Sequence, residues 1–197
     1  MQKTLPKPGF LVMAAGQSRR FGETCKLSAR VDSGCSLLEQ TVKTIQQVSS
    51  RICIVASASN EGVAVIGHRL GVELALYPNQ SPGLGDSITY GVKATSGWGG
   101  WIICLADMPR INSGIYQQVL ALSAGYPLVS PQFDGRRGHP VYFSSRYYKQ
   151  LIQLKGDRGA GSILKQNGAD LKLFDCGCPG VLQDVDTPQQ LAELPPG

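Results

Sequence analysis

The sequence predicts an α/β fold in which a mostly parallel sheet is covered by helices. Short apolar runs rich in β-branched residues alternate along the chain with longer segments of helical period. Strands of a parallel sheet are buried on both faces, so they are apolar throughout rather than alternating. Five runs fit this description, at residues 10–13, 52–56, 73–76, 101–105 and 128–130.

Length and composition favour one globular unit. The chain has 197 residues, of which 42% are hydrophobic and 17% charged, enough to build one well-packed core and too apolar for disorder. It contains no internal repeat, low-complexity tract or linker-like segment. We therefore expect a single domain spanning residues 1–197.

The charge distribution argues against nucleic acid as a partner. The net charge of +5 is modest, and the basic residues are scattered from Lys3 to Lys172 without an RNA-binding aromatic motif or zinc-finger spacing. An anionic small molecule is the better expectation.

Cysteine spacing and the N-terminus indicate the compartment. The six cysteines contain no C-x-x-C pair, and Cys53 and Cys104 lie in runs expected to be buried strands. The apolar run at 10–15 is too short for a membrane span or the apolar region of a signal peptide. We expect reduced thiols, a cytoplasmic protein and no membrane partner.

Two helix starts are marked. Ser36 and Glu39 have the S-x-x-E spacing of a capping box and precede an apolar face formed by Leu38, Val42 and Ile45. The last helix is expected at residues 187–190, with threonine as the cap, proline at the first position and glutamine at the third.

The region after the fifth run departs from the parallel pattern. Asp134-Gly135 is a typical hairpin turn, and it leads towards the apolar residues 141–143. This predicts a hairpin or a small antiparallel excursion.

The first apolar run leads into a loop suited to phosphate. Ala14, Ala15 and Gly16 allow the backbone to approach a ligand, and Arg19, Arg20 and Lys26 supply positive charge. The spacing matches neither G-x-x-x-x-G-K-[ST] nor G-x-G-x-x-G. The alternative is an ordinary turn with solvated basic side chains.

Carboxylates follow the strand at 101–105 and recur near the C-terminus. Asp107 is suited to hold Mg²⁺ together with substrate phosphates, although an aspartate here also commonly caps a turn. Strand alternation would place Asp184 and Asp186 on one face, where they would complete the metal site, with Asp184 slightly favoured. The helix dipole alone would also favour Asp186 at its position.

A glycine-rich loop at 77–88 opens another expected helix. Gly83 and Gly85 allow close backbone approach, and the helix N-terminus offers N–H groups to a base or ribose. A plain connection between strand and helix is the alternative. His139, between Gly138 and Pro140, is expected to be structural or at the surface rather than a general base.

Taken in order, these segments resemble the molybdenum cofactor cytidylyltransferases within the MobA-like NTP transferase family. The resemblance covers nearly the whole chain. It rests on the pattern A-A-G-x-S-x-R-x-G before Lys26, on the segments 82–88, 105–109 and 184–188, and on the segments 137–141 and 156–160.

The resemblance implies a single-domain, Rossmann-like three-layer nucleotidyltransferase that uses an NTP and Mg²⁺. It implies that CMP is transferred to the terminal phosphate of molybdopterin cofactor, with CTP favoured over GTP because Ala14-Ala15-Gly16 has the cytidylyl form. A molybdoenzyme or its chaperone is then an expected further partner. The roles that it implies are nucleotide binding at Ala14, Ala15, Gly16, Ser18, Arg20, Lys26, Gly83 and Ser87; catalysis by Arg20, Lys26 and Asp107; metal binding by Asp107, Asp184 and Asp186; and an acceptor side at Arg137, Gly138 and His139.

Two other functions remain open from the residues alone. One is a nucleotidyltransferase of the same fold that acts on a sugar or alcohol phosphate, and the other is a non-catalytic accessory protein that binds molybdenum cofactor. A dinucleotide-dependent oxidoreductase is disfavoured, since the glycine fingerprint is missing and the second strand ends without an acidic residue.

Overall fold

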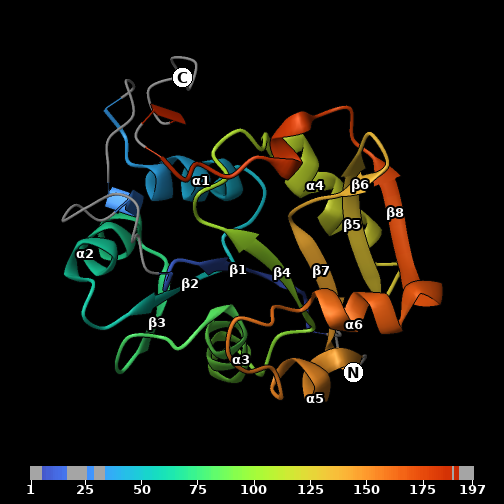
Figure 1. The fold of residues 1–197 in the computed structure, drawn as a ribbon, viewed down its shortest axis with the longest axis horizontal. Helices are drawn as coiled ribbons and strands as arrows, with labels where there is room; N and C mark the ends of the chain where they lie inside the picture. Colours follow the sequence, from blue (N-terminus) through green and yellow to red (C-terminus); the bar gives the residue numbers. More distant parts are fainter. Residues whose placement is uncertain (1–5, 17–25, 29–33, 188, 191–197) are drawn as a thin grey trace, which may run out of the picture.

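The computed structural model describes residues 6–16, 26–28, 34–187 and 189–190. Within these residues, eight strands form one sheet in the order β3-β2-β1-β4-β7-β5-β6, and β8 also pairs with β5 (Figure 1). The strands are β1 (Gly9–Met13), β2 (Ile52–Ser57), β3 (Glu73–Tyr77), β4 (Gly100–Leu105), β5 (Leu128–Phe133), β6 (Arg136–Arg137), β7 (Val141–Ser144) and β8 (Leu171–Asp175). The helices are α1 (Leu37–Gln46), α2 (Glu61–Leu70), α3 (Leu84–Ala94), α4 (Ser113–Leu122), α5 (Tyr148–Leu151) and α6 (Gly161–Gln166).

The mostly parallel sheet is confirmed. Strands β3, β2, β1 and β4 are mutually parallel, and β8 runs parallel to β5. The antiparallel part consists of β7, which lies between β4 and β5, and of the short β6. Asp134 and Gly135 form the turn between β5 and β6 with φ of 52° and 71°, as expected for the predicted hairpin.

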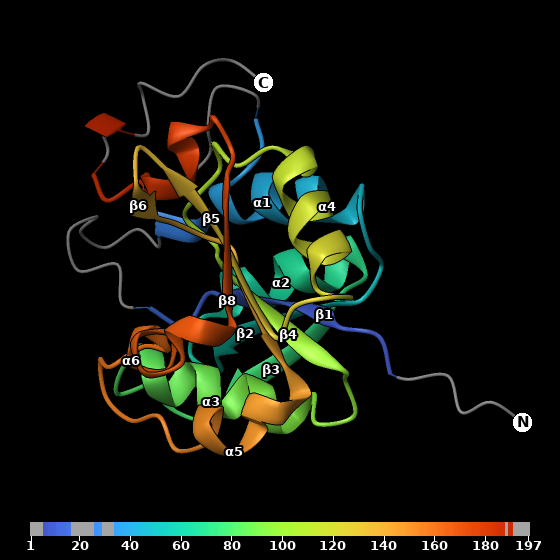
Figure 2. The same ribbon diagram turned by 90° about the vertical axis from the view of Figure 1, so that its right-hand side faces the viewer.

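Helices cover both faces of the sheet. Figure 2 shows the sheet nearly edge-on, with α1, α2 and α4 on one side and α3, α5 and α6 on the other. Alternate residues of β1 enter different cores: Phe10 and Val12 pack with the first group of helices, Leu11 and Met13 with the second. Because β1 is buried on both faces, its sequence is apolar throughout.

Local signals in the sequence account for the helix ends. Ser36 caps α1, and the capping box is complete because the Glu39 side chain accepts a hydrogen bond of 2.8 Å from the Ser36 N–H. Residues 189–190, after α6, are also helical, and the Gln190 N–H donates to Thr187 Oγ1 while the Thr187 N–H donates to Gln190 Oε1. Both predicted helix starts are confirmed.

The cysteines that the structure describes are free thiols. Cys53 and Cys104 lie in the core, and burial raises the pKa of the Cys53 thiol to about 12. Both thiols therefore stay protonated at neutral pH, in agreement with the prediction of reduced core cysteines. In the part of the chain that the structure describes, we find no helix with the length and hydropathy needed to cross a bilayer.

Candidate active site

The carboxyl ends of the parallel strands bring the predicted residues to one edge of the sheet. The chain after β1 carries Ala14, Ala15 and Gly16, and the chain after β4 carries Asp107. Strands β1 and β4 are adjacent and in register up to Met13 and Leu105, so these two segments leave the sheet side by side. Ligands of open α/β sheets bind at this kind of edge.

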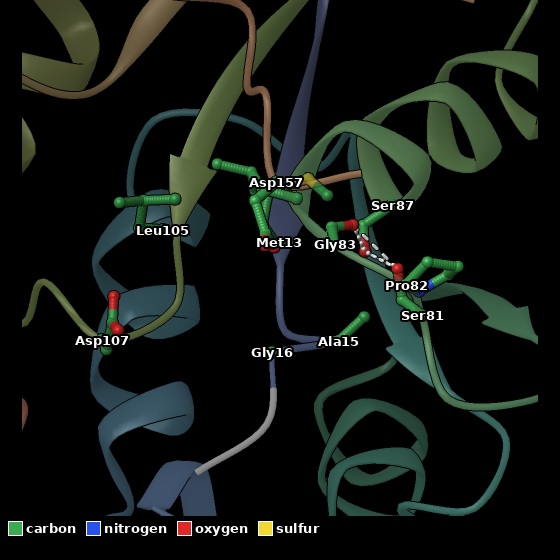
Figure 3. A pocket seen from close by; sticks show the side chains of 11 residues that line it. Met13, Ala15, Gly16, Ser81, Pro82, Gly83, Ser87, Leu105, Asp107 and Asp157 are labelled. Atoms are coloured by element: carbon green, nitrogen blue, oxygen red, sulfur yellow. Dashed lines mark hydrogen bonds between the residues drawn. The ribbon is translucent and has the colours of Figure 1, made fainter. Parts of the chain in front are cut away.

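A cavity of about 390 Å³ lies at this edge. Figure 3 shows Asp107 on one side of it and Ser81, Pro82 and Gly83 on the other, with Gly16 between them. The residues that line it are Met13, Ala15, Gly16, Ser81, Pro82, Gly83, Leu84, Ser87, Leu105, Asp107 and Asp157. Among the described residues, no atom would lie within 4 Å of a Cβ atom on Gly16. The close approach of a ligand to Gly16 stays a prediction.

Three hydrogen bonds to the backbone of Ala106 and Asp107 hold the chain at the end of β4. The Ala106 N–H donates to the Met13 carbonyl, Thr41 Oγ1 donates to the Ala106 carbonyl, and the Val185 N–H donates to the Asp107 carbonyl at 2.9 Å. The last of these brings the C-terminal segment to the end of β4. As a result, the backbone that carries the Asp107 carboxylate is hydrogen-bonded to β1, to α1 and to the C-terminal segment.

Asp107, Asp184 and Asp186 form a carboxylate cluster. One carboxylate oxygen from each residue lies within 4.8 Å of the others. The predicted strand around Asp184 and Asp186 is wrong, because residues 183–186 have no regular secondary structure. The Val185 N–H donates to the Asp107 carbonyl and the Asp186 N–H donates to Gln190 Oε1, so individual hydrogen bonds rather than a strand ladder hold this segment. The predicted convergence of the three side chains is nonetheless found.

Lys26 lies inside this cluster. Its Nζ is 2.9 Å from Asp107 Oδ2 and 2.7 Å from Asp186 Oδ1. Burial by itself lowers the pKa of the Lys26 ammonium, but the hydrogen bonds to Asp186 and Asp107 outweigh it and the pKa is raised above 10.5. The Lys26 side chain is therefore protonated and positively charged at neutral pH. The remaining predicted residues of the first loop, Ser18, Arg19 and Arg20, lie outside the described residues.

The glycines of the second loop serve a contact within the chain. A Cβ on Gly83 would lie 2.3 Å from the carbonyl carbon of Gly156, and one on Gly85 would lie 2.6 Å from the Arg158 carbonyl oxygen. The Gly156 N–H also donates to Asp86 at 2.6 Å. We predicted that Gly83 and Gly85 allow backbone approach to a ligand; the approach found here is to loop 156–158.

This packing places Asp157, which we did not predict as a site residue from the sequence, at the wall of the cavity. Asp157 lines the cavity with an exposed carboxylate. The signals in the sequence were its position in a polar, glycine-flanked loop and the place of segment 156–160 in the family resemblance. Ser87, which was predicted to contact nucleotide, also lines the cavity, but its hydroxyl is buried and donates to Ser81 Oγ and the Gly83 carbonyl. Ser87 therefore shapes the loop.

The segment predicted to face an acceptor lies at the start of β7. Because β7 is antiparallel to β4, residues before Val141 lie beyond its partner Ile103, towards the end of β4 that leads to Asp107. A Cβ on Gly138 would lie 2.3 Å from the Val181 carbonyl oxygen, and Arg137 is exposed.

His139 is held in this segment by its backbone. Its N–H donates to the Val181 carbonyl at 2.9 Å, and its ring Nδ1 is buried with no hydrogen-bond partner among the described residues. Burial lowers the pKa of His139 below 6.5, against the opposing effects of Ile103, Asp107 and Asp184. The ring is therefore neutral at pH 7.

Two sequence comparisons identify what this chain is similar to. Residues 10–171 match the family model described as the MobA-like NTP transferase domain. The purine catabolism protein PucB of Bacillus subtilis is 31% identical over 194 residues, covering 90% of this chain and 91% of that protein.

Solved structures share the fold at lower identity. Rv0371c of Mycobacterium tuberculosis superposes with a TM-score of 0.79 and 20% identity over 95% of this chain and 96% of that one. The complex of Rv0371c with manganese has a TM-score of 0.75 and 17% identity, covering 93% and 95% of the two chains. The molybdopterin-guanine dinucleotide biosynthesis protein A of Archaeoglobus fulgidus gives 0.60 and 15% identity over 93% and 94%.

Proposed function

Because this chain belongs to the family of MobA-like NTP transferases, we propose that it transfers CMP from CTP to the terminal phosphate of molybdopterin cofactor and releases pyrophosphate. The observation that carries the proposal is the position of Asp107. This residue lines the same cavity as Gly16 and Gly83 and also belongs to the carboxylate cluster. A nucleotide in that cavity would have its phosphates next to the acidic residues.

The two walls of the cavity bind different parts of the nucleotide. Ala14, Ala15 and Gly16 approach the phosphates, which Ser18, Arg20 and Lys26 also contact. Gly83 and Ser87 lie on the wall that receives base and ribose, and Asp157 lines the same cavity. Because a carboxylate only accepts hydrogen bonds, Asp157 is suited to ribose hydroxyls or an exocyclic amino group.

The carboxylate cluster fits Mg²⁺ as the metal. Asp107, Asp184 and Asp186 offer oxygen ligands, which Mg²⁺ and Mn²⁺ prefer, and one oxygen from each lies close to the others. The manganese complex of the similar protein Rv0371c supports a divalent cation here. When bound, Mg²⁺ would neutralise phosphate charge and polarise the reacting phosphoryl group.

The reaction needs no general base from the protein. The acceptor phosphate is ionised near neutral pH, and one of its oxygens forms a bond to the α-phosphorus of CTP while the bond to the pyrophosphate oxygen breaks. The task of the chain is to hold the two anions in line and to offset their repulsion. In this proposal Arg20 and Lys26 stabilise the negative charge of the departing pyrophosphate.

The acceptor lies along Arg137, Gly138 and His139. Arg137 is exposed and offers a guanidinium suited to a phosphate. His139 is neutral at pH 7 and its Nδ1 is buried without a hydrogen-bond partner among the described residues, so the ring adds no charge to the acceptor side. The segment begins next to the strand end that leads to Asp107, so a bound acceptor would face the α-phosphate.

The relatives suggest where the product is used. The relative at 31% identity is named a purine catabolism protein. We therefore expect the product to be delivered, in the cytoplasm, to a molybdoenzyme of purine breakdown or to its chaperone.

Pyrophosphate release tests the proposal directly. The purified protein is incubated with Mg²⁺ and CTP, GTP, ATP or UTP, each with molybdopterin cofactor, a sugar phosphate or an alcohol phosphate. We expect release with CTP and molybdopterin cofactor, and slower release with GTP. Release only with another phosphate would assign a different acceptor, and binding of the cofactor without release would identify an accessory protein.

A further inference from the structure

The position of Lys26 indicates how the binding of metal and the binding of nucleotide affect each other. This inference rests on the proposed metal and nucleotide sites. Its side chain is 8% exposed, whereas those of Asp107 and Asp186 are 25% and 41% exposed. The Lys26 side chain is therefore largely shielded from solvent, whereas the two carboxylates that it contacts remain partly accessible to an incoming ligand. Asp107 and Asp186 can therefore be reached by a ligand while their charge is offset by Lys26.

The ammonium offsets repulsion within the cluster. Three carboxylate oxygens within 4.8 Å of one another carry like charges that disfavour the arrangement unless a cation is present. Lys26 contacts two of these residues at ordinary charge-assisted hydrogen-bond distances. In this structure the cation that the cluster requires is supplied by the chain.

An ammonium and a divalent cation compete for the same oxygens. Mg²⁺ binds oxygen at about 2.0–2.1 Å, so a metal on Asp107 and Asp186 would lie very close to an ammonium that contacts both. Two cations at such a separation repel strongly in a partly buried site. Either the metal binds weakly while Lys26 is present, or Lys26 leaves.

A bound triphosphate would give Lys26 an alternative anionic partner. It begins the 3-10 helix Lys26–Ser28, and its partner Asp107 lines the cavity that also contains Gly16. The lysine side chain is a mobile point charge on a flexible stem of four carbons. A triphosphate in the cavity would offer it a new partner at the moment when the metal takes the carboxylates.

We propose that Lys26 is an exchangeable internal cation, which occupies the carboxylate cluster in the free protein and moves to the triphosphate when metal and nucleotide bind together. The exchange disfavours uptake of a bare metal ion and couples metal binding to nucleotide binding. Lys26 thereby acts as a positioning residue as well as a phosphate ligand.

Mn²⁺ binding measured with and without nucleotide tests this proposal. Lys26→Met removes the charge while keeping a side chain of similar length. Titration of Mn²⁺ alone, followed by the electron paramagnetic resonance signal of free Mn²⁺, is expected to show at least about tenfold tighter binding to the variant than to the wild type. Titration of CTP at saturating Mn²⁺ is expected to show weaker nucleotide binding to the variant. Equal or weaker binding of Mn²⁺ alone to the variant would overturn the proposal.

Chemical labelling gives a readout that needs no variant. In the wild-type protein, acetylation of Lys26 by acetic anhydride, quantified by mass spectrometry, should be low without metal, several-fold higher with saturating Mn²⁺ and low again with Mn²⁺ and CTP. Unchanged labelling across the three conditions would contradict the exchange. Neither readout measures transfer, so a protein that shows the exchange but transfers no nucleotide would refute only the proposed function.

Discussion

Lys26 Nζ lies 2.7 Å from Asp186 Oδ1, although the two residues are 160 positions apart in the chain. The same ammonium contacts Asp107, at the end of β4, at 2.9 Å. One lysine therefore joins the segment after β1, the segment after β4 and the C-terminal segment. The geometry of the candidate active site depends on these three segments together.

Replacing Asp107 tests the metal site. Asp107→Asn keeps the size of the side chain but removes its charge, and loss of one electrostatic contact of this kind costs about 2.7–4 kcal/mol of transition-state stabilisation. We expect turnover, measured as pyrophosphate release, to fall about a hundredfold or more while the circular dichroism spectrum is unchanged. Glu61→Gln, the same chemical change on the exposed surface of α2, should keep full turnover. Near-normal rates in the Asp107 variant would exclude the proposed role.

Adding a methyl group at Gly83 tests the packing of the second loop. In Gly83→Ala the new carbon would meet the backbone of Gly156 at 2.3 Å, so loop 156–158 must move, and overpacking of this kind costs roughly 1–3 kcal/mol. We expect a lower melting temperature and a higher KM for the nucleotide. In the matched control Gly97→Ala, no atom of the part of the chain that the structure describes lies within 4 Å of the new carbon, and both quantities should be unchanged. Identical behaviour of the two variants would contradict this account of Gly83.

Asp157→Asn tests recognition of the nucleoside. Loss of a charge-assisted hydrogen bond costs about 1.5 kcal/mol, which corresponds to roughly a tenfold higher KM for CTP. We expect kcat to change little, since Asp157 is assigned to binding rather than to the reacting phosphates. Asp134→Asn makes the same change at an exposed turn where asparagine tolerates the positive φ of 52°. A KM equal to that of the wild type would remove Asp157 from the nucleoside site.

The capping box of α1 predicts an acid-sensitive contribution to stability. Burial alone would raise the pKa of Glu39, but hydrogen bonds from Ser36 and the charge of Arg69 lower it below 4.5. A carboxyl group with a lowered pKa stabilises the fold above its unfolded pKa and loses this effect as the pH falls through its folded pKa. Urea denaturation should show Glu39→Gln less stable than the wild type by about 0.5–1 kcal/mol at pH 7, with the difference shrinking as the pH falls below 4.5. A difference that is constant with pH would rule out the charge as its source.

Local and periodic features of the fold could be predicted from the sequence. The strands of the parallel part are continuously apolar because helices cover both of their faces, as the alternate packing of Phe10 and Leu11 illustrates. The Ser36 and Thr187 caps and the Asp134-Gly135 turn depend on side chains within a few residues, so short patterns specify them.

Features that depend on distant contacts could not be predicted. Strand β8 is only partly buried and carries Lys172, so its apolar pattern is weak, and it is defined by pairing with β5. Asp184 and Asp186 alternate as in a strand, but Val185 bonds to Asp107 and leaves the segment irregular. The ion pairs of Lys26 and the entry of Asp157 into the cavity likewise arise from segments that meet only in the folded chain.

The most direct test of the central claim follows the α-phosphate. CTP labelled with ³²P at the α-position is incubated with the protein, Mg²⁺ and molybdopterin cofactor, and the products are separated. The account predicts that the label becomes bound to the cofactor in an amount equal to the pyrophosphate released. Label that stays in CTP, or that appears only as free CMP, would contradict nucleotidyl transfer to this acceptor.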